Sequence, residues 1–221
     1  MPTDRPLGMF KFGERQYIEQ FAGGLLYMNP LSYFIKQEAN SVRGDSNEGT
    51  DHIMQAHGWL LQIKVGEEFK DVGTIAGPVR HRAPSDLNAN VFCMHALRTN
   101  AADTLVNPKN QAFGDTFAVL IEFDEFMKRV KAAVLSTNYD LHYGLVEYLD
   151  EGSYNGPVGI FRKDSCFSYQ SEFRIALLPG AGIPYELRIG DLSDIVMIGP
   201  LRELNQRLRI EGSTSTPAIS S

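Results

Sequence analysis

The segment SYQSEFRIAL, residues 168–177, shows the clearest alternation of apolar and polar positions in the chain. Side chains alternate between the two faces of a strand, so residues 171–178 are expected to form a strand with one apolar and one polar face. The apolar face carries Phe173, Ile175 and Leu177, and the polar face carries Gln170, Glu172 and Arg174. The apolar face predicts burial, whereas the polar face is either solvated or lines a cleft.

The first 40 residues predict the order strand, helix, strand, helix, with very short connections. Residues 10–12 fit a short strand, and residues 14–22 fit a helix that buries Tyr17, Ile18 and Phe21 and stops at the following glycines. Residues 25–28 form a short apolar strand, which Asn29-Pro30 turns into a second helix. The residues themselves favour core packing for Tyr27 and helix capping for Asn29 over contacts with a ligand.

The remainder of the chain is rich in predicted strands. Residues 40–52, NSVRGDSNEGTDH, predict a loop that is long enough to act as a lid or recognition loop. Nine strands are expected after it, at residues 59–65, 72–75, 91–96, 117–123, 143–148, 159–162, 171–178, 185–189 and 195–199. Alternate residues of one apolar run are expected to share the core with the strand at 171–178: Phe117, Val119 and Ile121.

Two helices are expected in this second part, at residues 125–135 with Asp124 as N-cap and at residues 201–208. We therefore expect an α+β fold of mostly antiparallel sheets, with helices concentrated in the N-terminal part. A single domain is expected over residues 1–210, followed by a flexible tail, EGSTSTPAISS, at 211–221.

Composition is that of an ordinary globular protein, with 221 residues, 43% hydrophobic and 22% charged. The formal charge of −6 argues against a broad phosphate-binding surface, although a local basic patch is compatible with it. We expect no membrane span and no signal peptide, because no apolar run is long enough. The two cysteines suit a reducing cytoplasm, and they show no metal-ligand spacing.

Gln170 and Glu172 form a Q-x-E pair, which is the main candidate for chemistry. The carboxylate of such a pair can hold a ribose hydroxyl and stabilise positive charge at an anomeric carbon, while the amide orients an acceptor. Cleavage of an N-glycosidic bond passes through an oxocarbenium-like state that a fixed carboxylate stabilises. The alternative is that Glu172 and Arg174 are solvated or pair with charges across the sheet.

The loop at 40–52 offers a weaker candidate. Its acidic residues and His52 match neither a calcium loop nor the helical histidine pair of a zinc protease, so a solvated acidic turn is favoured over a metal site. Arg43, next to a glycine, is a candidate contact for an anion or a pyrophosphate. His95, on an apolar strand, is expected to be buried and hydrogen-bonded.

Several short motifs, taken in order, resemble a widespread bacterial and phage family of small proteins of unknown function. They are KFGERQYIEQFAGGLLYMNPLSYF, VFCMHAL, FAVLIEFDEF, YGLVEY and RKDSCFSYQSEFRI, and they span roughly residues 10–200. Members of that family run from a Lys/Arg-containing first strand to a strand resembling LYMN. They finish on a strand with the pattern lysine–aromatic–Tyr-(Glu/Gln)-x-Glu-aromatic-Arg. The family's FNDPFE-like turn is replaced here by MNPLSYFIKQE.

That pattern in turn resembles the ADP-ribosyltransferase fold, in which an early strand and helix clamp NAD in a cleft between two small sheets. The resemblance implies NAD as co-substrate, Glu172 as the catalytic glutamate and Gln170 as the acceptor-side residue. It places Lys11 on the first NAD-contacting strand and Tyr27 or Tyr33 near the nicotinamide. The remaining candidate NAD-binding residues are Asn29, Arg43 and Arg174.

Three functions follow as hypotheses. The first is an NAD-dependent ADP-ribosyltransferase, a toxin or phage effector in a bacterial or infected cell, whose acceptor is a host protein or nucleic acid. The second is a non-catalytic phage or bacterial binding protein that sequesters a host factor or a nucleotide ligand. A nuclease-like enzyme that uses the acidic loop is weaker, because no second acidic cluster accompanies that loop. Glu172 separates the first two, since an enzyme requires it and a binder tolerates its loss.

Overall fold

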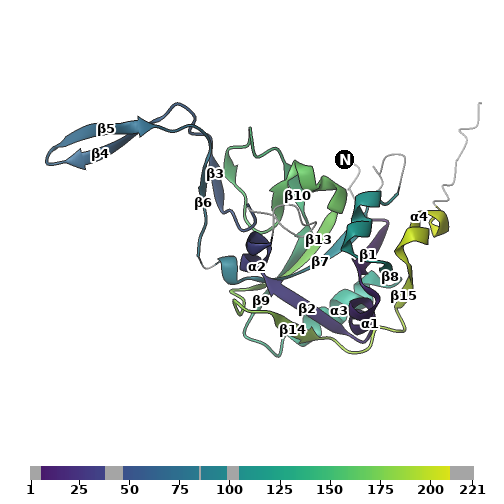
Figure 1. Cartoon of the computed structure of the whole chain (residues 1–221). Coiled ribbons are helices and arrows are strands. Elements are labelled where there is room, and N and C mark those ends of the chain that lie inside the picture. Colours follow the sequence, from purple (N-terminus) through teal and green to yellow (C-terminus); the bar gives the residue numbers. More distant parts are fainter. Residues whose placement is uncertain (1–5, 38–46, 85, 99–104, 210–221) are drawn as a thin grey trace, which may run out of the picture.

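The computed structural model describes residues 6–37, 47–84, 86–98 and 105–209, which form an α+β fold of mostly antiparallel sheets (Figure 1). Arg43 and the tail predicted at 211–221 lie outside the described residues.

The N-terminal order of strand, helix, strand and helix is confirmed. The four elements are β1 (Gly8–Gly13), α1 (Arg15–Ala22), β2 (Leu25–Pro30) and α2 (Leu31–Lys36). Helix α1 buries Ile18 and Phe21, but Tyr17 is exposed, which corrects the prediction that all three are buried. The first turn of α2 has no side-chain cap, so the prediction that Asn29 caps this helix is wrong.

The rest of the chain is rich in strands, as predicted, although the strand expected at 159–162 begins only at Arg162. Its strands are β3 (His52–Met54), β4 (Leu60–Val65), β5 (Glu68–Thr74), β6 (Val79–His81), β7 (Asn90–Leu97), β8 (Thr116–Leu120), β9 (Asp140–Leu145), β10 (Glu147–Leu149), β11 (Gly156–Pro157), β12 (Arg162–Asp164), β13 (Glu172–Leu178), β14 (Tyr185–Arg188) and β15 (Val196–Pro200). Its α-helices are α3 (Phe123–Val134) and α4 (Leu204–Arg207), and its short 3-10 helices are η1 (Asp86–Asn88), η2 (Pro108–Phe113), η3 (Ser165–Gln170) and η4 (Leu201–Glu203).

Helix α3, the longest of the described helices, lies in the middle of the chain, so the helices are less concentrated in the N-terminal part than predicted. Its N-cap is Glu122, two residues before the predicted Asp124. Asp124 lies instead in the first turn, where a carboxylate interacts favourably with the helix dipole.

Strand β7 is the centre of the main sheet. Strand β13 pairs along one edge of β7, with β9 outside it, while β1 and β2 share the other edge. Strands β8 and β15 extend the sheet beyond β1, and β14 extends it beyond β2. All of these pairs are antiparallel, and β10 with β12 is the parallel pair among the described strands.

The edge of β7 that β1 and β2 share is split in the middle. Strand β1 pairs with it from Leu97 to His95, and β2 pairs with it only at Val91 and Asn90. Between these ends β1 stays with β8 and β2 stays with β14, so the two strands diverge. The backbone N–H and C=O of Cys93 on this edge therefore face a gap in the sheet, whereas those of Phe92 and Met94 point towards β13.

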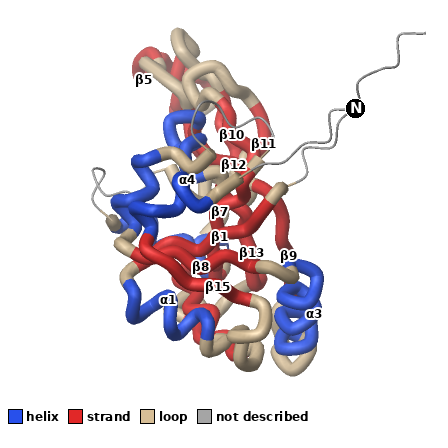
Figure 2. Tube along the Cα trace, turned by 90° about the vertical axis from the view of Figure 1, so that its right-hand side faces the viewer, coloured by secondary structure: helices blue, strands red, loops and turns tan. Residues whose placement is uncertain are grey.

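The main hydrophobic core lies on one face of the sheet, under α1 and α3 (Figure 2). Phe173, Ile175 and Leu177 are buried in it, which confirms the predicted apolar face of β13. The face predicted for β8 is wrong. Ala118 and Leu120 enter this core, while Phe117 packs in a second cluster on the opposite face and Ile121 is 57% exposed. The run at 117–123 is apolar at nearly every position, so its periodicity does not identify the inward face.

None of the helices among the described residues is long and apolar enough to cross a membrane.

Candidate functional site

A cavity of about 520 Å³ opens at the split between β1 and β2. Five consecutive residues of β7, 91–95, line it. Neighbouring residues of a strand point to opposite faces, so a lining of this kind means that the cavity meets the strand at its edge. Seven of the eight candidate catalytic and NAD-binding residues line this one cavity: Lys11, Tyr27, Asn29, Tyr33, Gln170, Glu172 and Arg174.

Lys11 closes part of the split. Its ammonium donates to the main-chain carbonyl of Cys93 at 2.7 Å, and its Nζ lies 4.3 Å from the centre of the Phe92 ring. The carbonyl of Cys93 lies on the stretch of β7 that neither β1 nor β2 reaches. A lysine thus supplies the donor that a neighbouring strand would otherwise provide, and its positive charge is fixed at the cavity wall.

The residues from β2 and α2 give the cavity an aromatic side. Tyr27 is 49% exposed, so the expectation that it packs in the core is wrong. It lies opposite Glu186 of β14, which also lines the cavity. Tyr33 of α2 is half-buried and packs edge-on against Phe34, with ring centres 5.3 Å apart. Asn29 faces the cavity instead of capping α2.

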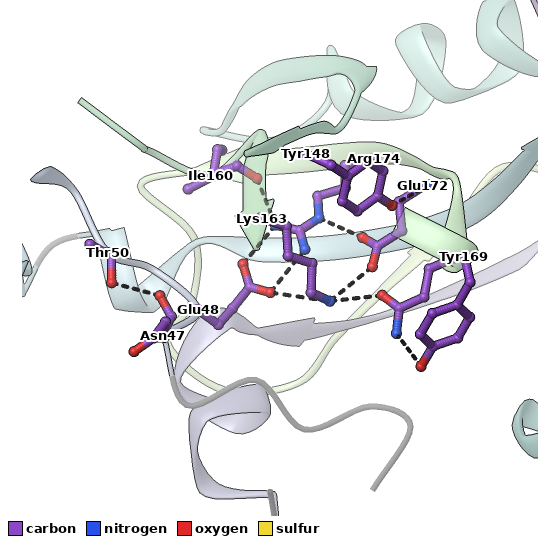
Figure 3. A network of polar contacts seen from close by, with 10 residues as sticks. Asn47, Glu48, Thr50, Tyr148, Ile160, Lys163, Tyr169, Glu172 and Arg174 are labelled. Atoms are coloured by element: carbon purple, nitrogen blue, oxygen red, sulfur yellow. Dashed lines mark hydrogen bonds and ion pairs between the residues drawn. The ribbon is translucent and has the colours of Figure 1, made fainter. Parts of the chain in front are cut away.

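The polar face of β13 is buried and takes part in a network of four charges, shown in Figure 3. Arg174 donates from Nε to Oε2 of Glu172 at 2.8 Å, and its Nη1 and Nη2 donate to the two oxygens of Glu48 at 2.7 and 2.9 Å. Its Nη1 also donates to the carbonyl of Ile160 at 2.6 Å. Arg174 is only 2% exposed, and these bonds hold its guanidinium against the protein. Its geometry is therefore that of a residue that positions Glu172.

Lys163 of β12 joins the same network. Its Nζ donates to Oε1 of Glu172 at 3.0 Å and to Oε1 of Gln170 at 2.9 Å, and it lies 3.8 Å from Oε2 of Glu48. The same ammonium lies 4.5 Å from the centre of the Phe167 ring. The buried group thus contains two carboxylates and two cations, whose formal charges cancel.

Gln170 reaches this network from outside the strand. It is the last residue of η3, and Ser171 between it and β13 has a left-handed backbone with φ 43°. The prediction that Gln170 and Glu172 share one strand face is therefore wrong. Their side chains meet because Lys163 bonds to both of them. Gln170 is itself 3% exposed, and its main-chain carbonyl accepts a bond at 2.7 Å from Nδ1 of His95.

The network fixes the charge of Glu172. Burial by itself raises the pKa of this carboxyl group, but the charges of Arg174 and Lys163 and their hydrogen bonds outweigh burial and hold the pKa well below its usual range. Glu172 is therefore an ionised carboxylate at neutral pH. Arg174 remains charged as well, since the two carboxylates raise its pKa in spite of burial.

Three further titratable groups near Glu172, namely Cys93, Tyr148 and His95, are neutral at neutral pH. Burial raises the pKa of the Cys93 thiol to about 12, and the Glu172 carboxylate adds to the effect. Burial also raises the pKa of Tyr148, whose hydroxyl accepts a bond from the main-chain N–H of Glu172 at 2.9 Å. Burial lowers the pKa of His95, which is buried and hydrogen-bonded as expected. A neutral histidine and a protonated thiol are poor candidates for a nucleophile pair.

Sequence reasoning missed Glu48 and Lys163. The sequence favours a solvated acidic turn at Glu48, yet this residue is 4% exposed and makes a two-bond ion pair with Arg174. Neighbouring bonds anchor its turn: Asn47 donates to Glu151 at 2.9 Å, and the Thr50 hydroxyl donates to the carbonyl of Asn47 at 2.6 Å. A signal for Lys163 is present in the sequence, because a lysine precedes the aromatic residues in the pattern of the family that the chain resembles.

Within the described ranges, no group of three or more His, Cys, Asp or Glu side chains is arranged to hold a metal ion. No protein-family model, curated protein or solved structure matches the chain. The resemblance to ADP-ribosyltransferases therefore rests on the short sequence motifs alone.

Proposed function

We propose that the protein is an NAD-dependent ADP-ribosyltransferase-like enzyme whose cavity binds NAD at the split in the sheet. The observation that carries this proposal is the ionised Glu172 carboxylate, which Arg174 and Lys163 hold rigidly at the wall of the cavity. A fixed negative charge in a site shielded from water is what stabilises positive charge that develops during a reaction.

The residues present are compatible with a dinucleotide. The cavity volume, about 520 Å³, lies within the range of small-molecule sites. Tyr27 and Tyr33 offer aromatic faces for a nicotinamide or adenine ring. The Lys11 ammonium offers a positive charge for a pyrophosphate, although it is already bonded to the Cys93 carbonyl and would be shared.

The proposed reaction needs no reagent beyond NAD and an acceptor. The bond between ribose C1′ and the nicotinamide nitrogen breaks, and nicotinamide leaves with the electron pair, which neutralises its ring charge. Glu172 stabilises the oxocarbenium-like state at C1′. An acceptor nucleophile then bonds to C1′ and loses a proton, and water in its place gives free ADP-ribose. We propose Gln170 as the residue that orients the acceptor, a host protein or nucleic acid.

One observation favours the second hypothesis, a binding protein that sequesters a host factor or a nucleotide. Both carboxylate oxygens of Glu172 already accept bonds from cations, which is typical of a structural ion pair. On this reading the cavity binds a nucleotide without cleaving it, and Glu172 only maintains the shape of the wall.

The two functions are distinguished by incubating the protein with NAD labelled in the adenine and, separately, in the nicotinamide. The enzyme releases nicotinamide and transfers adenine label to protein or nucleic acid when cell lysate is added. The binding protein retains intact NAD or another nucleotide in equilibrium dialysis and releases no nicotinamide. Failure to bind or cleave NAD, in the presence of lysate, would contradict the transferase proposal.

A further inference from the structure

The hairpin of β4 and β5 projects from the body of the protein as an arm (Figure 1). Its two strands pair only with each other among the described strands, and every residue from 57 to 74 is exposed. The arm follows β3 and precedes β6, which pair with each other at its base. Its residues belong to none of the three hydrophobic clusters of the body.

The exposed arm is unusually apolar. Seven large apolar side chains on it are each more than half exposed: Trp59, Leu60, Leu61, Ile63, Val65, Phe69 and Val72. Large exposed apolar patches mark contact sites, and an isolated two-stranded hairpin is at best marginally stable in water. Pairing with strands of a partner would therefore stabilise the arm.

The two outer edges of the arm are not equally open. The outer edge of β5 is interrupted by a bulge, where the pairing shifts between Leu61 and Gln62, and it carries Glu68, Lys70 and Asp71. Bulges and charges are the features that keep an edge strand from pairing with another chain. The edge of β4 has neither a bulge nor more than one charge, Lys64. The open edge of the arm is thus that of β4.

The direction of the free backbone groups on β4 follows from the turn. Gly66 and Glu67 form a two-residue turn between Val65 and Glu68, and in such a turn the closing residues are hydrogen-bonded to each other. Hydrogen-bonded and non-hydrogen-bonded pairs alternate along an antiparallel ladder. The N–H and C=O groups of Gln62 and Lys64 therefore point away from β5, towards any added strand.

We propose that this edge pairs with the same edge of a second copy of the chain, in antiparallel register centred on Ile63. The backbone of Gln62 then hydrogen-bonds to the backbone of Lys64 of the second copy, and the backbone of Lys64 bonds in the same way to Gln62 of the second copy. These bonds use all the outward N–H and C=O groups identified above. Leu61 lies opposite Val65 of the second copy, and Ile63 lies opposite its own counterpart, so one face gains three apolar pairs. No like charges oppose each other in this register. A two-fold interface of this kind closes, and it converts two marginal hairpins into one four-stranded sheet.

The test is the mass of the full chain in solution, measured by sedimentation over a wide concentration range. We expect a concentration-dependent species of twice the monomer mass. Ile63→Lys opposes two like charges at the axis and should give a monomer, whereas Val72→Lys, on the bulge of β5, should leave the dimer intact. Both variants should keep the wild-type melting temperature at low protein concentration, because neither side chain contacts the core.

A cysteine cross-link tests the register. In a Cys166→Ser background, which removes an exposed thiol, Ile63→Cys should form an intermolecular disulfide on mild oxidation, since non-hydrogen-bonded pairs bring the two Cα atoms close enough. Phe69→Cys should not. A monomer at every concentration, assemblies larger than two, or cross-linking through Phe69→Cys in preference to Ile63→Cys would each overturn the proposal. The inference is independent of the proposed enzymatic activity.

Discussion

Replacing Lys163 by methionine tests whether the four buried charges stabilise the protein as one balanced unit. The substitution keeps an unbranched side chain of similar length and removes the positive charge. It leaves Glu172 and Glu48 with Arg174 as their only cation in the cluster, and it removes the donor to both Glu172 and Gln170. Lys163 and Glu172 are both at least nine-tenths buried. Removing one partner of a buried ion pair typically costs about 3–5 kcal/mol, and we expect that range here.

The charge balance makes a sharper prediction for the double variant. Glu172→Gln alone leaves an excess positive charge and presents an amide N–H₂ to one of two cations. Combined with Lys163→Met, it restores neutrality in the cluster. We therefore expect the double variant to be less destabilised than the sum of the single variants, with a coupling of about 1–3 kcal/mol.

The assay is urea unfolding at neutral pH, followed by circular dichroism, on the wild type, the two single variants and the double variant. Lys128→Met is the matched control, because Lys128 also pairs with a glutamate but is 78% exposed, and surface pairs contribute little. Additive losses in the double variant, or a Lys163→Met variant as stable as Lys128→Met, would refute the idea that the cluster is a balanced unit.

Two further predictions concern the site. Gln170→Ala should reduce transfer of ADP-ribose to an acceptor more than hydrolysis of NAD, measured side by side in one labelled assay; equal losses would remove the acceptor role. The free energy of unfolding should fall in two steps as the pH is lowered. His95 has a lowered pKa in the folded state, so below about pH 6.5 the unfolded chain protonates this histidine more readily than the folded protein does. Glu172 also has a lowered pKa in the folded state, so its contribution to stability is lost as the pH falls below about 4.3. The free energy of unfolding, measured against pH, should lose the first step in His95→Asn and the second in Glu172→Gln, and two unchanged profiles would contradict these assignments.

The sequence supports much of the strand order because turn residues and alternation are local signals. The apolar face of β13 and the clustering of Lys11, Tyr27 and Glu172 at one cavity were anticipated. The face of β8 was not, because its run is apolar on both sides and both of its faces are covered by clusters. The left-handed backbone at Ser171 has no signal in the sequence, since only Gly, and less often Asn or Asp, indicates such a conformation.

The buried network shows a second limit of sequence reasoning. Glu48 lies in a stretch of turn-forming and charged residues that reads as solvated, and its partner Arg174 is 126 positions away. Local composition cannot distinguish a solvated glutamate from one that is carried into the core by the anchored turn around Asn47. The sequence predicts β4 well, at residues 59–65, but it predicts only the end of β5, at 72–75. The exposure of the arm reflects its lack of contacts with the body, which the alternation of apolar and polar residues does not reveal.

The central claim, that the Glu172 carboxylate acts on NAD, is tested most directly by nicotinamide release from Glu172→Gln at matched folded fraction. Glu151→Gln is the control, because Glu151 is a buried carboxylate paired with Arg80, outside the lining of the cavity. The account predicts that Glu172→Gln loses turnover by a factor on the order of 10²–10³, the usual effect of removing one well-placed electrostatic group. It predicts that Glu151→Gln, once corrected for its lower stability, turns over NAD at close to the wild-type rate. Equal turnover in the two variants would contradict the claim and leave the binding-protein function in its place.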